Sequence, residues 1–309
     1  MLMKSGFVGL TALLLLGCEA KPVAEKTAPE PAPAPEPAPK PVADPALLKT
    51  VLAADWRTDE AKARDKFRNP AETLEFCQVN PATNITEIWP GSGWYSQILV
   101  PWVHANGGKF TAAIIDPQSS EGAANLLSRY LEQFSDKEQF GEIATAPLSA
   151  DSELFSAPAS QDFVLTFRNV HSWMGRNMAE KAFADFYAAL KPGGVLCLVE
   201  HRLPSDAVQD AVAGSGYVQE AMVKALASEA GFIFEERSEI NANPKDTADH
   251  PFGVWTLPPT RRSPNSDEEK QANPDFDRAK YDAIGESDRM TLRFRKPEAE
   301  TSTEEPDGQ

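Results

Sequence analysis

The sequence has few of the residues that build metal and redox sites. Its 309 residues include only three cysteines and four histidines. There is no Cys-x-x-Cys pair and no Cys/His spacing of the kind that binds zinc, so we expect no metal site. Cys77 and Cys197 lie in apolar surroundings, which favours buried free thiols, although a disulfide between them is compatible with the sequence.

Clusters of basic residues are also absent. The formal net charge is −16, and no stripe of Lys and Arg runs along any segment. Because clustered basic side chains are needed to bind phosphate backbones, this balance argues against nucleic acid as a partner.

Long apolar runs are missing as well. Residues 7–16 form an apolar run of about ten residues, whereas a membrane-spanning helix needs about 20. Lys4 precedes this run, and Leu15-Leu16-Gly17-Cys18 ends it. The pattern resembles a bacterial lipoprotein signal peptide over residues 1–18, with Cys18 as the lipidated residue. An ordinary secretory signal or an N-terminal anchor are the alternatives.

The signal predicts where the protein resides. Glu19 is not the aspartate that this class associates with retention at the inner membrane. We therefore expect a periplasmic protein whose lipid is its only membrane contact, at the outer membrane of a Gram-negative bacterium. Residues 19–45 are rich in Pro and Ala, which favours an extended tether. Residues 298–309 form an acidic tail that we expect to be disordered.

Apolar strands alternate with helical patterns between residues 46 and 297. Such alternation predicts a mainly parallel sheet with helices on both faces, and ligands bind beyond the carboxyl ends of its strands. We expect helices at residues 47–56, 59–67, 70–76, 94–104, 120–133, 177–190 and 218–230, and strands at residues 86–88, 110–115, 143–146, 163–167 and 195–199.

A long polar segment separates the last two predicted strands. Residues 232–240 and 289–295 have strand patterns, and alternation in the second indicates a half-buried strand. We expect the two to pair as an antiparallel hairpin at the sheet edge. Residues 241–287 form an insertion, which at this length is either functional or partly disordered.

A glycine-containing turn follows the first apolar strand. Residues 89–93, Trp-Pro-Gly-Ser-Gly, separate that strand from an amphipathic run. Such a turn lets the backbone approach a nucleotide closely, and the first N–H groups of the next helix are free to bind it. Glu87, on the strand, adds a carboxylate that can bind an amino or hydroxyl group. We therefore expect a nucleotide-type cofactor.

Asp116 narrows the type of cofactor. It ends the second strand about 23 residues beyond Gly93, where a carboxylate can bind both ribose hydroxyls. A turn cap before Pro117 is the alternative. A dinucleotide site needs a third glycine, but Ser96 occupies that position. A methyl-donor nucleoside has no phosphates and requires only an acid and a shortened glycine turn.

Several segments, taken in order, resemble the class I S-adenosylmethionine-dependent methyltransferases. Residues 191–194, Lys-Pro-Gly-Gly, look like the turn before that superfamily's fifth strand, and residues 162–171 look like its fourth strand and the following loop. More narrowly, residues 68–74, 89–95 and 250–255 resemble a bacterial family of predicted methyltransferases of undefined substrate. The resemblance covers about residues 45–296. It implies an α/β, Rossmann-like sheet of seven strands, mostly parallel, with an antiparallel C-terminal hairpin.

The resemblance also implies S-adenosylmethionine as the cofactor and a set of contacts for it. These are Glu87, Gly91, Gly93 and Tyr95 around the methionine part, Asp116 at the ribose, Ala146, Pro147 and Leu148 near the adenine, and Asn169 by the sulfonium. The sequence departs from the superfamily in one respect. No Asp directly follows the third strand to bind the adenine amino group, and Asp151 is the nearest candidate.

Two histidines are the candidate catalytic residues. Methyl transfer from a sulfonium is an in-line displacement, for which the protein aligns a nucleophile, excludes water and sometimes removes a proton. His171 follows the fourth strand and His201 follows the fifth; a structural hydrogen bond is the alternative for each. We expect Arg168, Trp173 and Arg202 on the same rim. His250, near Trp255 in the insertion, is expected to be part of a lid or to make a structural contact.

Three functions fit these observations. The first is a methyltransferase whose acceptor, a small molecule or a protein, the sequence does not identify. The second is a catalytically silent binding module of the cell envelope, because the methyl donor is made in the cytoplasm whereas the signal predicts export. The third is a nicotinamide oxidoreductase. The oligomeric state is not indicated.

Overall fold

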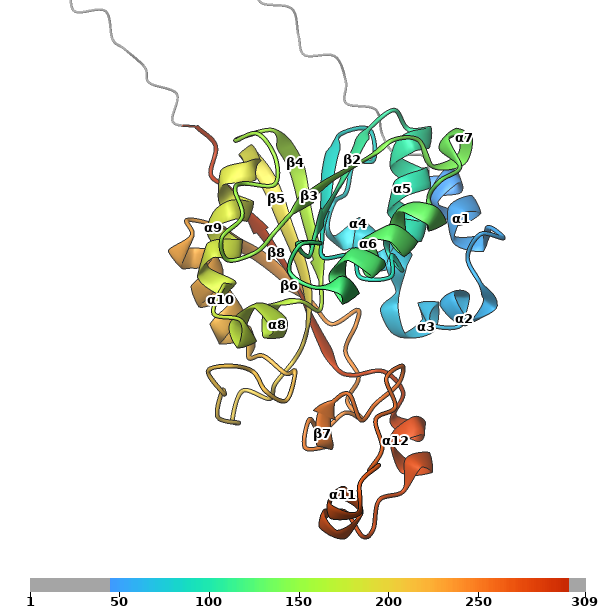
Figure 1. The fold of residues 1–309 in the computed structure, drawn as a ribbon. Helices are drawn as coiled ribbons and strands as arrows, with labels where there is room; N and C mark the ends of the chain where they lie inside the picture. Colours follow the sequence, from blue (N-terminus) through green and yellow to red (C-terminus); the bar gives the residue numbers. More distant parts are fainter. Residues whose placement is uncertain (1–44, 300–309) are drawn as a thin grey trace, which may run out of the picture. The chain divides into compact units, whose positions relative to one another are not determined.

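The computed structural model describes residues 45–299, which build a seven-stranded sheet flanked by helices (Figure 1). The strand order is β3-β2-β1-β4-β5-β8-β6. β1 to β5 pair in parallel, and β8 runs antiparallel between β5 and β6. The strands are Asn84–Ile88 (β1), Lys109–Ile114 (β2), Ile143–Pro147 (β3), Gln161–Phe167 (β4), Leu190–His201 (β5), Ile233–Ser238 (β6) and Arg289–Arg295 (β8). The predicted fold class is confirmed.

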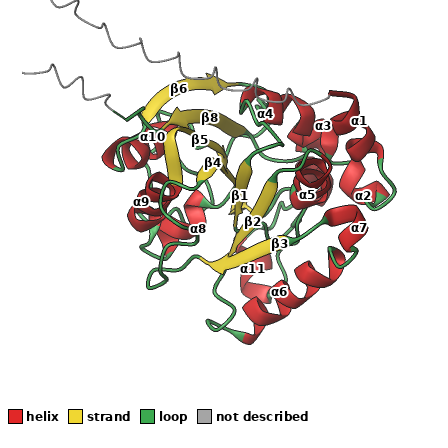
Figure 2. Cartoon of the chain, turned by 90° about the horizontal axis from the view of Figure 1, so that it is seen from above, coloured by secondary structure: helices red, strands yellow, loops and turns green. Residues whose placement is uncertain are grey.

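Helices cover both faces of the sheet (Figure 2). One side carries α1 (Pro45–Ala53), α2 (Asp59–Lys62), α3 (Asp65–Arg68), α4 (Pro70–Phe76), α5 (Ser96–Ala105), α6 (Glu121–Gln133) and α7 (Lys137–Phe140). The other side carries α8 (Val170–Gly175), α9 (Ala179–Ala189) and α10 (Glu220–Glu229). The helix expected at residues 59–67 is divided into α2 and α3 by a break at Ala63 and Arg64.

Each face of the sheet has its own apolar core. Successive side chains of a strand point to opposite faces, so a strand between two helical layers is apolar throughout. In β5, Leu196 and Leu198 pack into the core beside α9, whereas Cys197 and Val199 pack into the core beside α5. The near-continuous apolar runs of β4 and β5 follow from this double coverage.

β8 pairs with β6, as expected, but it is not half-buried. Every residue from Arg289 to Phe294 is buried. β5 lies on one side of β8 and β6 on the other, while the N-terminal helices cover its polar positions. Arg289 donates to the carbonyl of Phe67 at 3.0 Å, and Arg293 donates to the carbonyl of Phe76. The alternation in β8 therefore reflects polar side chains that bind buried carbonyls and carboxylates.

Cys77 and Cys197 form a disulfide, so the prediction of free thiols was wrong. Cys77 follows α4 and Cys197 lies in the middle of β5, at a sequence separation of 120 and a Cα–Cα distance of 5.6 Å. Both residues are buried. Their apolar surroundings were read correctly, but packing of α4 against the sheet brings the two sulfurs together, which residue spacing could not reveal.

The insertion is folded and lies beside the carboxyl ends of the strands (Figure 1). It contains β7 (Pro251–Val254), α11 (Asp267–Ala272) and α12 (Arg278–Ile284). Buried Asp246 anchors it, because its carboxylate accepts hydrogen bonds from Tyr217 Oη at 3.0 and 3.1 Å and faces His250 Nε2 at 2.7 Å. His250 therefore makes the structural contact that was one of its two expected roles.

Several predictions concern the ends of the chain. The signal peptide, Cys18 and the linker up to residue 44 lie outside the described residues, as do residues 300–309 of the tail. Within residues 45–299, none of the helices combines the length and apolar character required to cross a membrane.

Candidate active site

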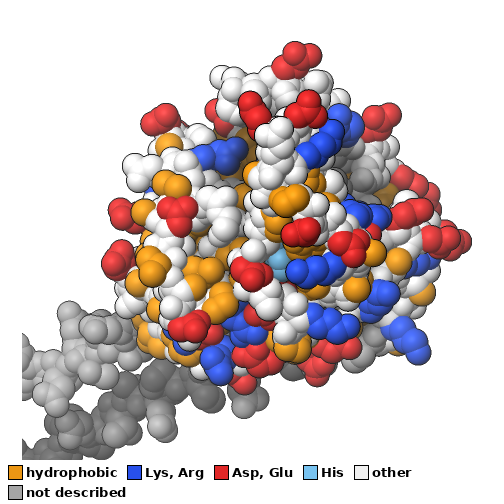
Figure 3. Space-filling model, turned by 90° about the horizontal axis from the view of Figure 1, so that it is seen from below, with side chains coloured by type: hydrophobic (Ala, Val, Ile, Leu, Met, Phe, Trp, Pro, Cys, Tyr) orange, Lys and Arg blue, Asp and Glu red, His pale blue; other side chains and the backbone are white. Residues whose placement is uncertain are grey.

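A cavity of about 270 Å³ opens at the carboxyl ends of β1, β4 and β5. Its walls come from α3, the glycine-containing turn, the segments after β4 and β5, the start of β8, and the insertion. Of the predicted site residues, it is lined by Glu87, Gly91, Tyr95, Asn169, His171 and His201. Seen from below, the surface on the side of the insertion carries intermixed acidic and basic side chains with a histidine visible among them (Figure 3).

The turn after β1 has the conformation that its glycines predicted. Gly91 and Gly93 have φ angles of +60° and +81°, a region that disfavours side chains. A Cβ on Gly91 would meet no atom within 4 Å, so this glycine leaves open space beside the backbone. A Cβ on Gly93 would lie 3.0 Å from the ring of Phe134. Gly91 thus faces the cavity, whereas Gly93 allows α6 to pack against the turn.

Trp89 closes one side of the site. It has a φ of +44° and is 8% exposed. Its indole Nε1 donates to the carbonyl of Leu148 at 3.0 Å, and its ring packs against Trp173 at 5.9 Å. The indole therefore fills the space between the ends of β1 and β3. A residual cavity of about 20 Å³ remains there, and Gly91 and Ile115 are among its lining residues.

Asp116 and Pro147 lie outside the main cavity. Pro147 is exposed at the end of β3. Asp116 follows β2, where its Oδ1 accepts a hydrogen bond from the N–H of Gln118 at 2.8 Å and its carbonyl accepts one from Ser119 at 2.6 Å. These contacts are those of the turn cap, which was the alternative role for Asp116. A role in binding the ribose stays a prediction.

Glu87 is buried at the back of the cavity. Ser96 Oγ donates to its Oε2 at 2.6 Å, and Tyr130 donates in turn to Ser96 at 3.1 Å. Burial raises the pKa of Glu87 to about 8, with the Ser96 hydrogen bond and the charge of Arg168 acting in the opposite direction. Without a cationic partner, Glu87 is therefore mostly protonated at neutral pH.

Tyr95 and Asn169 shape the wall between β1 and β4. The ring of Tyr95 stacks on Phe167 at 3.5 Å, and its hydroxyl donates to the carbonyl of Arg68 at 3.2 Å. The amide of Asn169 donates to the carbonyl of Ile88 at 2.9 Å. These contacts hold the ends of the two strands together and leave the tyrosine hydroxyl engaged.

His171 and Glu200 form a hydrogen-bonded pair. His171 Nδ1 lies 3.0 Å from Glu200 Oε1, and Glu200 also accepts hydrogen bonds from the N–H groups of Val170 at 2.5 Å and His201 at 2.8 Å. A carboxylate only accepts, so it selects the His171 tautomer with a proton on Nδ1. Nε2 has no partner among residues 45–299 and can accept a proton from a ligand.

His201 has a different environment. Its Nδ1 lies 2.5 Å from Ser287 Oγ, and its ring centroid is 5.5 Å from that of His171. Burial, reinforced by His171 and nearby arginines, lowers the pKa of His201 well below its usual range. It is neutral at physiological pH.

The two histidines and Glu200 also place three potential metal ligands within 4.8 Å of one another, a grouping that the sequence did not indicate. The electrostatics disfavour a cation here. Glu200 is already engaged by backbone donors, and the charges of Arg68, Arg168 and Arg289 all act on His201. The arrangement therefore fits a proton-accepting histidine with an orienting carboxylate better than a metal centre.

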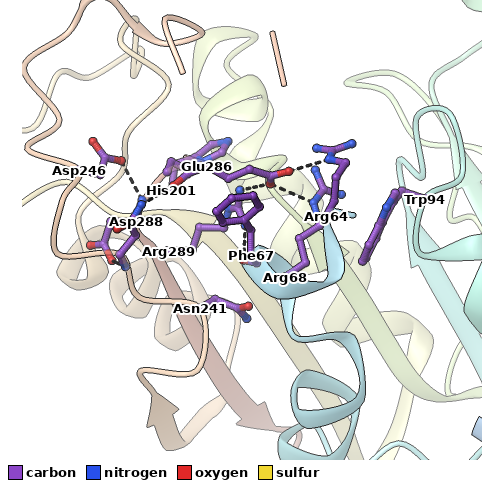
Figure 4. A network of polar contacts seen from close by, with 12 residues as sticks. Arg64, Phe67, Arg68, Trp94, His201, Asn241, Asp246, Glu286, Asp288 and Arg289 are labelled. Atoms are coloured by element: carbon purple, nitrogen blue, oxygen red, sulfur yellow. Dashed lines mark hydrogen bonds and ion pairs between the residues drawn. The ribbon is translucent and has the colours of Figure 1, made fainter. Parts of the chain in front are cut away.

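Three arginines that were not predicted as site residues also line the cavity (Figure 4). Arg64, the N-cap of α3, and Arg68, its last residue, bind Glu286 at 2.6 and 3.0 Å, and Arg289 at the start of β8 binds the same carboxylate. The three arginines lower the pKa of Glu286 to about 2 despite its burial. The i, i+4 spacing of Arg64 and Arg68 was the feature of the sequence that could have indicated that the two side chains lie on one face of a helix.

The other rim predictions have mixed outcomes. Arg168 does line the cavity, as does Trp255, for which no position was predicted. Trp173 is fully buried in the core beside α9, so its placement on the rim was wrong. Arg202 binds Asp288 at 2.8 Å and Glu239 at 2.8 Å, and therefore holds β6 and the end of the insertion to β5.

No protein-family model matches the chain, and no curated protein matches its sequence. Solved structures do match its fold. The [4+2]-cyclase SpnF has a TM-score of 0.52 and 14% identity, covering 80% of this chain and 85% of that chain. A protein from Galdieria sulphuraria designated a sarcosine dimethylglycine methyltransferase has a TM-score of 0.51 and 18% identity. The match covers 77% of this chain and 86% of that chain.

A S-adenosylmethionine-dependent methyltransferase from Aquifex aeolicus is similar at a TM-score of 0.47 and 14% identity, covering 64% of this chain and 93% of that chain. At these identities the likeness concerns the fold alone. The strand order, the antiparallel β8 and the helices on both faces agree with it. The chain has the Rossmann-like fold of the S-adenosylmethionine-dependent methyltransferases.

Proposed function

We propose that this protein is an S-adenosylmethionine-dependent methyltransferase. The observation that carries the proposal is the pairing of His171 with Glu200 in the same cavity as Glu87 and the glycine-containing turn. A fold of this class places a cofactor at the carboxyl ends of its strands, and the cavity lies there. The proton acceptor therefore stands beside the expected methyl donor.

The residues of the cavity suit the methionine part of the cofactor. Glu87 would accept hydrogen bonds from an ammonium group, which would also stabilise its ionised form. Gly91 lines both the main cavity and the small one near Ile115, so the nucleoside would pass over this glycine toward Asp116. Because Trp89 fills the adjacent space, we propose that the adenine lies over the turn and outside the buried core.

Residues of the protein would remove the acceptor's proton and exclude water. The bound cofactor would supply an electrophilic methyl group. His171 Nε2 would take a proton from the acceptor's nucleophilic atom as that atom attacks, and Glu200 would stabilise the imidazolium that results. Trp255, whose ring is 6.1 Å from that of His171, lies with the insertion over the cavity and would exclude water.

Binding of the cofactor is the first test. We expect the full chain, purified in detergent, to bind S-adenosylmethionine in a calorimetric titration and not to bind NAD. Asp116→Ala should weaken binding about 10- to 100-fold, because it removes charge-assisted hydrogen bonds to the ribose. Asp206→Ala, an exposed carboxylate on a loop, is the matched control. Absence of binding at millimolar cofactor would overturn the proposal.

Substitution of His171 is the second test of the proposed function. We expect His171→Gln to lower the turnover number about 100- to 10,000-fold, because a general base typically contributes that much, and to leave cofactor affinity unchanged. The measurement is S-adenosylhomocysteine release in the presence of cell-envelope extract. His104→Gln replaces an exposed histidine of α5 and should behave as wild type. Equal turnover in the two variants would remove His171 from the mechanism.

A binding module without activity is the second candidate. It is favoured by Trp89, which occupies the space toward β3, and by the lack of an acid directly after that strand. One fold neighbour is designated a cyclase, so this fold also serves other chemistry. Cofactor binding without any methyl transfer to envelope extract would support this candidate over the first.

We also propose that the protein is exported and anchored through lipidated Cys18. The disulfide between Cys77 and Cys197 supports export, because structural disulfides persist in oxidising compartments such as the periplasm. Metabolic labelling with a fatty acid should tag the wild type and not Cys18→Ser. Labelling of both would point to another site of modification, and labelling of neither would point to an ordinary secretory signal or an N-terminal anchor.

A further inference from the structure

The cavity carries more positive than negative charge. Four arginines line it, namely Arg64, Arg68, Arg168 and Arg289. Glu286 is the carboxylate that faces three of them. Glu200 is engaged by His171 and by backbone N–H groups, and Glu87 is mostly protonated. The cavity therefore has an excess of about two positive charges next to the histidines.

Arg68 and Arg168 have the most donors to spare. Among the other two arginines, Arg64 Nη2 and Arg289 Nε are buried donors that also lack an acceptor within residues 45–299. Arg68 is 3% exposed; its Nε binds Glu286 at 3.0 Å, while Nη1 and Nη2 have no acceptor within residues 45–299. Arg168, directly after β4, makes no side-chain hydrogen bond or ion pair in the same part of the chain. A buried guanidinium whose donors lack acceptors, such as that of Arg68, is costly, and a bidentate oxyanion is its natural partner. Arg168 is half-buried and lines the same cavity.

The arginines are close to the histidines, because, together with burial, the charges of Arg289, Arg168 and Arg68 lower the pKa of His201. Arg168 is three residues before His171, and Arg289 is the direct cross-strand partner of His201. Figure 4 shows Arg64 and Arg68 directed toward Glu286, with Arg289 on its other side. An oxyanion bound by Arg68 and Arg168 would therefore hold the rest of its molecule near His171 Nε2.

We propose that Arg68 and Arg168 form an oxyanion subsite for the molecule that receives the methyl group. This inference rests on the proposed function. It assigns the acceptor to organic acids or phosphate esters, which share an oxyanion, and excludes cationic acceptors. The guanidinium charges that disfavour a metal ion beside His201 are the ones that would bind this group.

Inorganic phosphate and acetate probe the subsite without knowledge of the acceptor. With the full chain in detergent at constant pH and ionic strength, we expect saturable binding of at least one of the two in calorimetry. The preferred anion indicates whether the acceptor is a phosphate ester or a carboxylic acid. Arg168→Gln should weaken binding at least 10-fold, and it should fold, since Arg168 has no side-chain partner to lose. Arg129→Gln, on the exposed side of α6, should not change binding.

Arg68→Gln is a second variant, with its melting temperature as the check on folding. Lack of saturable anion binding in the wild type, or unchanged binding in both variants, would overturn the subsite.

The cofactor's own carboxylate is the competing occupant. We expect saturating S-adenosylhomocysteine to change the anion affinity less than threefold, because acceptor and cofactor must bind together. If the two compete, the arginines bind the cofactor and the inference about the acceptor is wrong. Anion binding without any binding of S-adenosylhomocysteine would leave an oxyanion site but overturn both the proposed function and the acceptor assignment.

Discussion

Replacing Cys77 and Cys197 by alanine should lower the free energy of unfolding by about 5 kcal/mol. The disulfide closes a loop of 120 residues, and a cross-link over that length removes much of the conformational freedom of the unfolded chain. It also ties α4 to the centre of the sheet, next to α3 and its arginines. Urea denaturation of the full chain in detergent, followed by tryptophan fluorescence, would measure the difference.

The wild type under reducing conditions provides the matched control. Because both cysteines are buried, we expect a thiol reductant to leave the native protein oxidised and to act only as urea opens it. The unfolding midpoint of the reduced wild type should then approach that of Cys77→Ala/Cys197→Ala. If the wild type with its disulfide fully reduced had the same unfolding midpoint as the oxidised wild type, the disulfide would contribute little to stability.

Stability of the wild type should fall with rising pH relative to Glu87→Gln. Burial raises the pKa of Glu87 to about 8 in the folded state, whereas an unfolded glutamate titrates near its ordinary value of about 4.3. Between these values the unfolded chain loses a proton that the folded protein retains, so stability decreases. Above pH 8 the folded state ionises as well and the loss is complete. The upper bound on this loss of stability is about 5 kcal/mol.

The measurement is the free energy of unfolding of both proteins from pH 5 to pH 9. The difference between them isolates Glu87, because the other titrating groups are common to both. We expect the free energy of unfolding of Glu87→Gln to increase relative to that of the wild type with each step in pH up to 8. Glu75→Gln, an exposed carboxylate of α4, should run parallel to the wild type. Parallel curves for Glu87→Gln would show that Glu87 is not buried in an apolar environment.

The same group links pH to the proposed cofactor. An ammonium group bound at Glu87 requires the ionised carboxylate, so binding below pH 8 must release its proton. Affinity for S-adenosylmethionine should therefore rise with pH up to about 8 in the wild type and lose this dependence in Glu87→Gln. The effect is opposite in sign to that on stability, and the two together would place the ligand's charge beside Glu87.

Much of the site was predictable because its residues directly adjoin strands. Glu87, Asn169, His171 and His201 are at or just beyond the carboxyl ends of β1, β4 and β5, where a parallel sheet gathers its ligands. Gly91 was recognisable from the turn it forms. The predictions for Glu87, Gly91 and the two histidines needed only the local pattern and the rule that parallel strands end at one edge, whereas Asn169 was implied by the resemblance to the methyltransferases.

Other parts depend on elements far apart in the chain. Arg68 and Glu286 are 218 residues apart, and the insertion folds back to bring them together. The restriction that Trp89 places on the space near β3 follows from its contact with Leu148. The pairing of His171 with Glu200 depends on the register between β4 and β5.

By itself the sequence determined the sheet, the turn after β1 and the edge at which a ligand would bind. These follow from apolar periodicity, glycine and strand order, which act over short distances along the chain. Only the tertiary structure decided that Cys77 bonds to Cys197, that Trp89 restricts the space toward β3, and that arginines from α3, β4 and β8 meet in one cavity. Side chains that are distant in sequence acquire a common environment only when the helices and the insertion pack against the sheet.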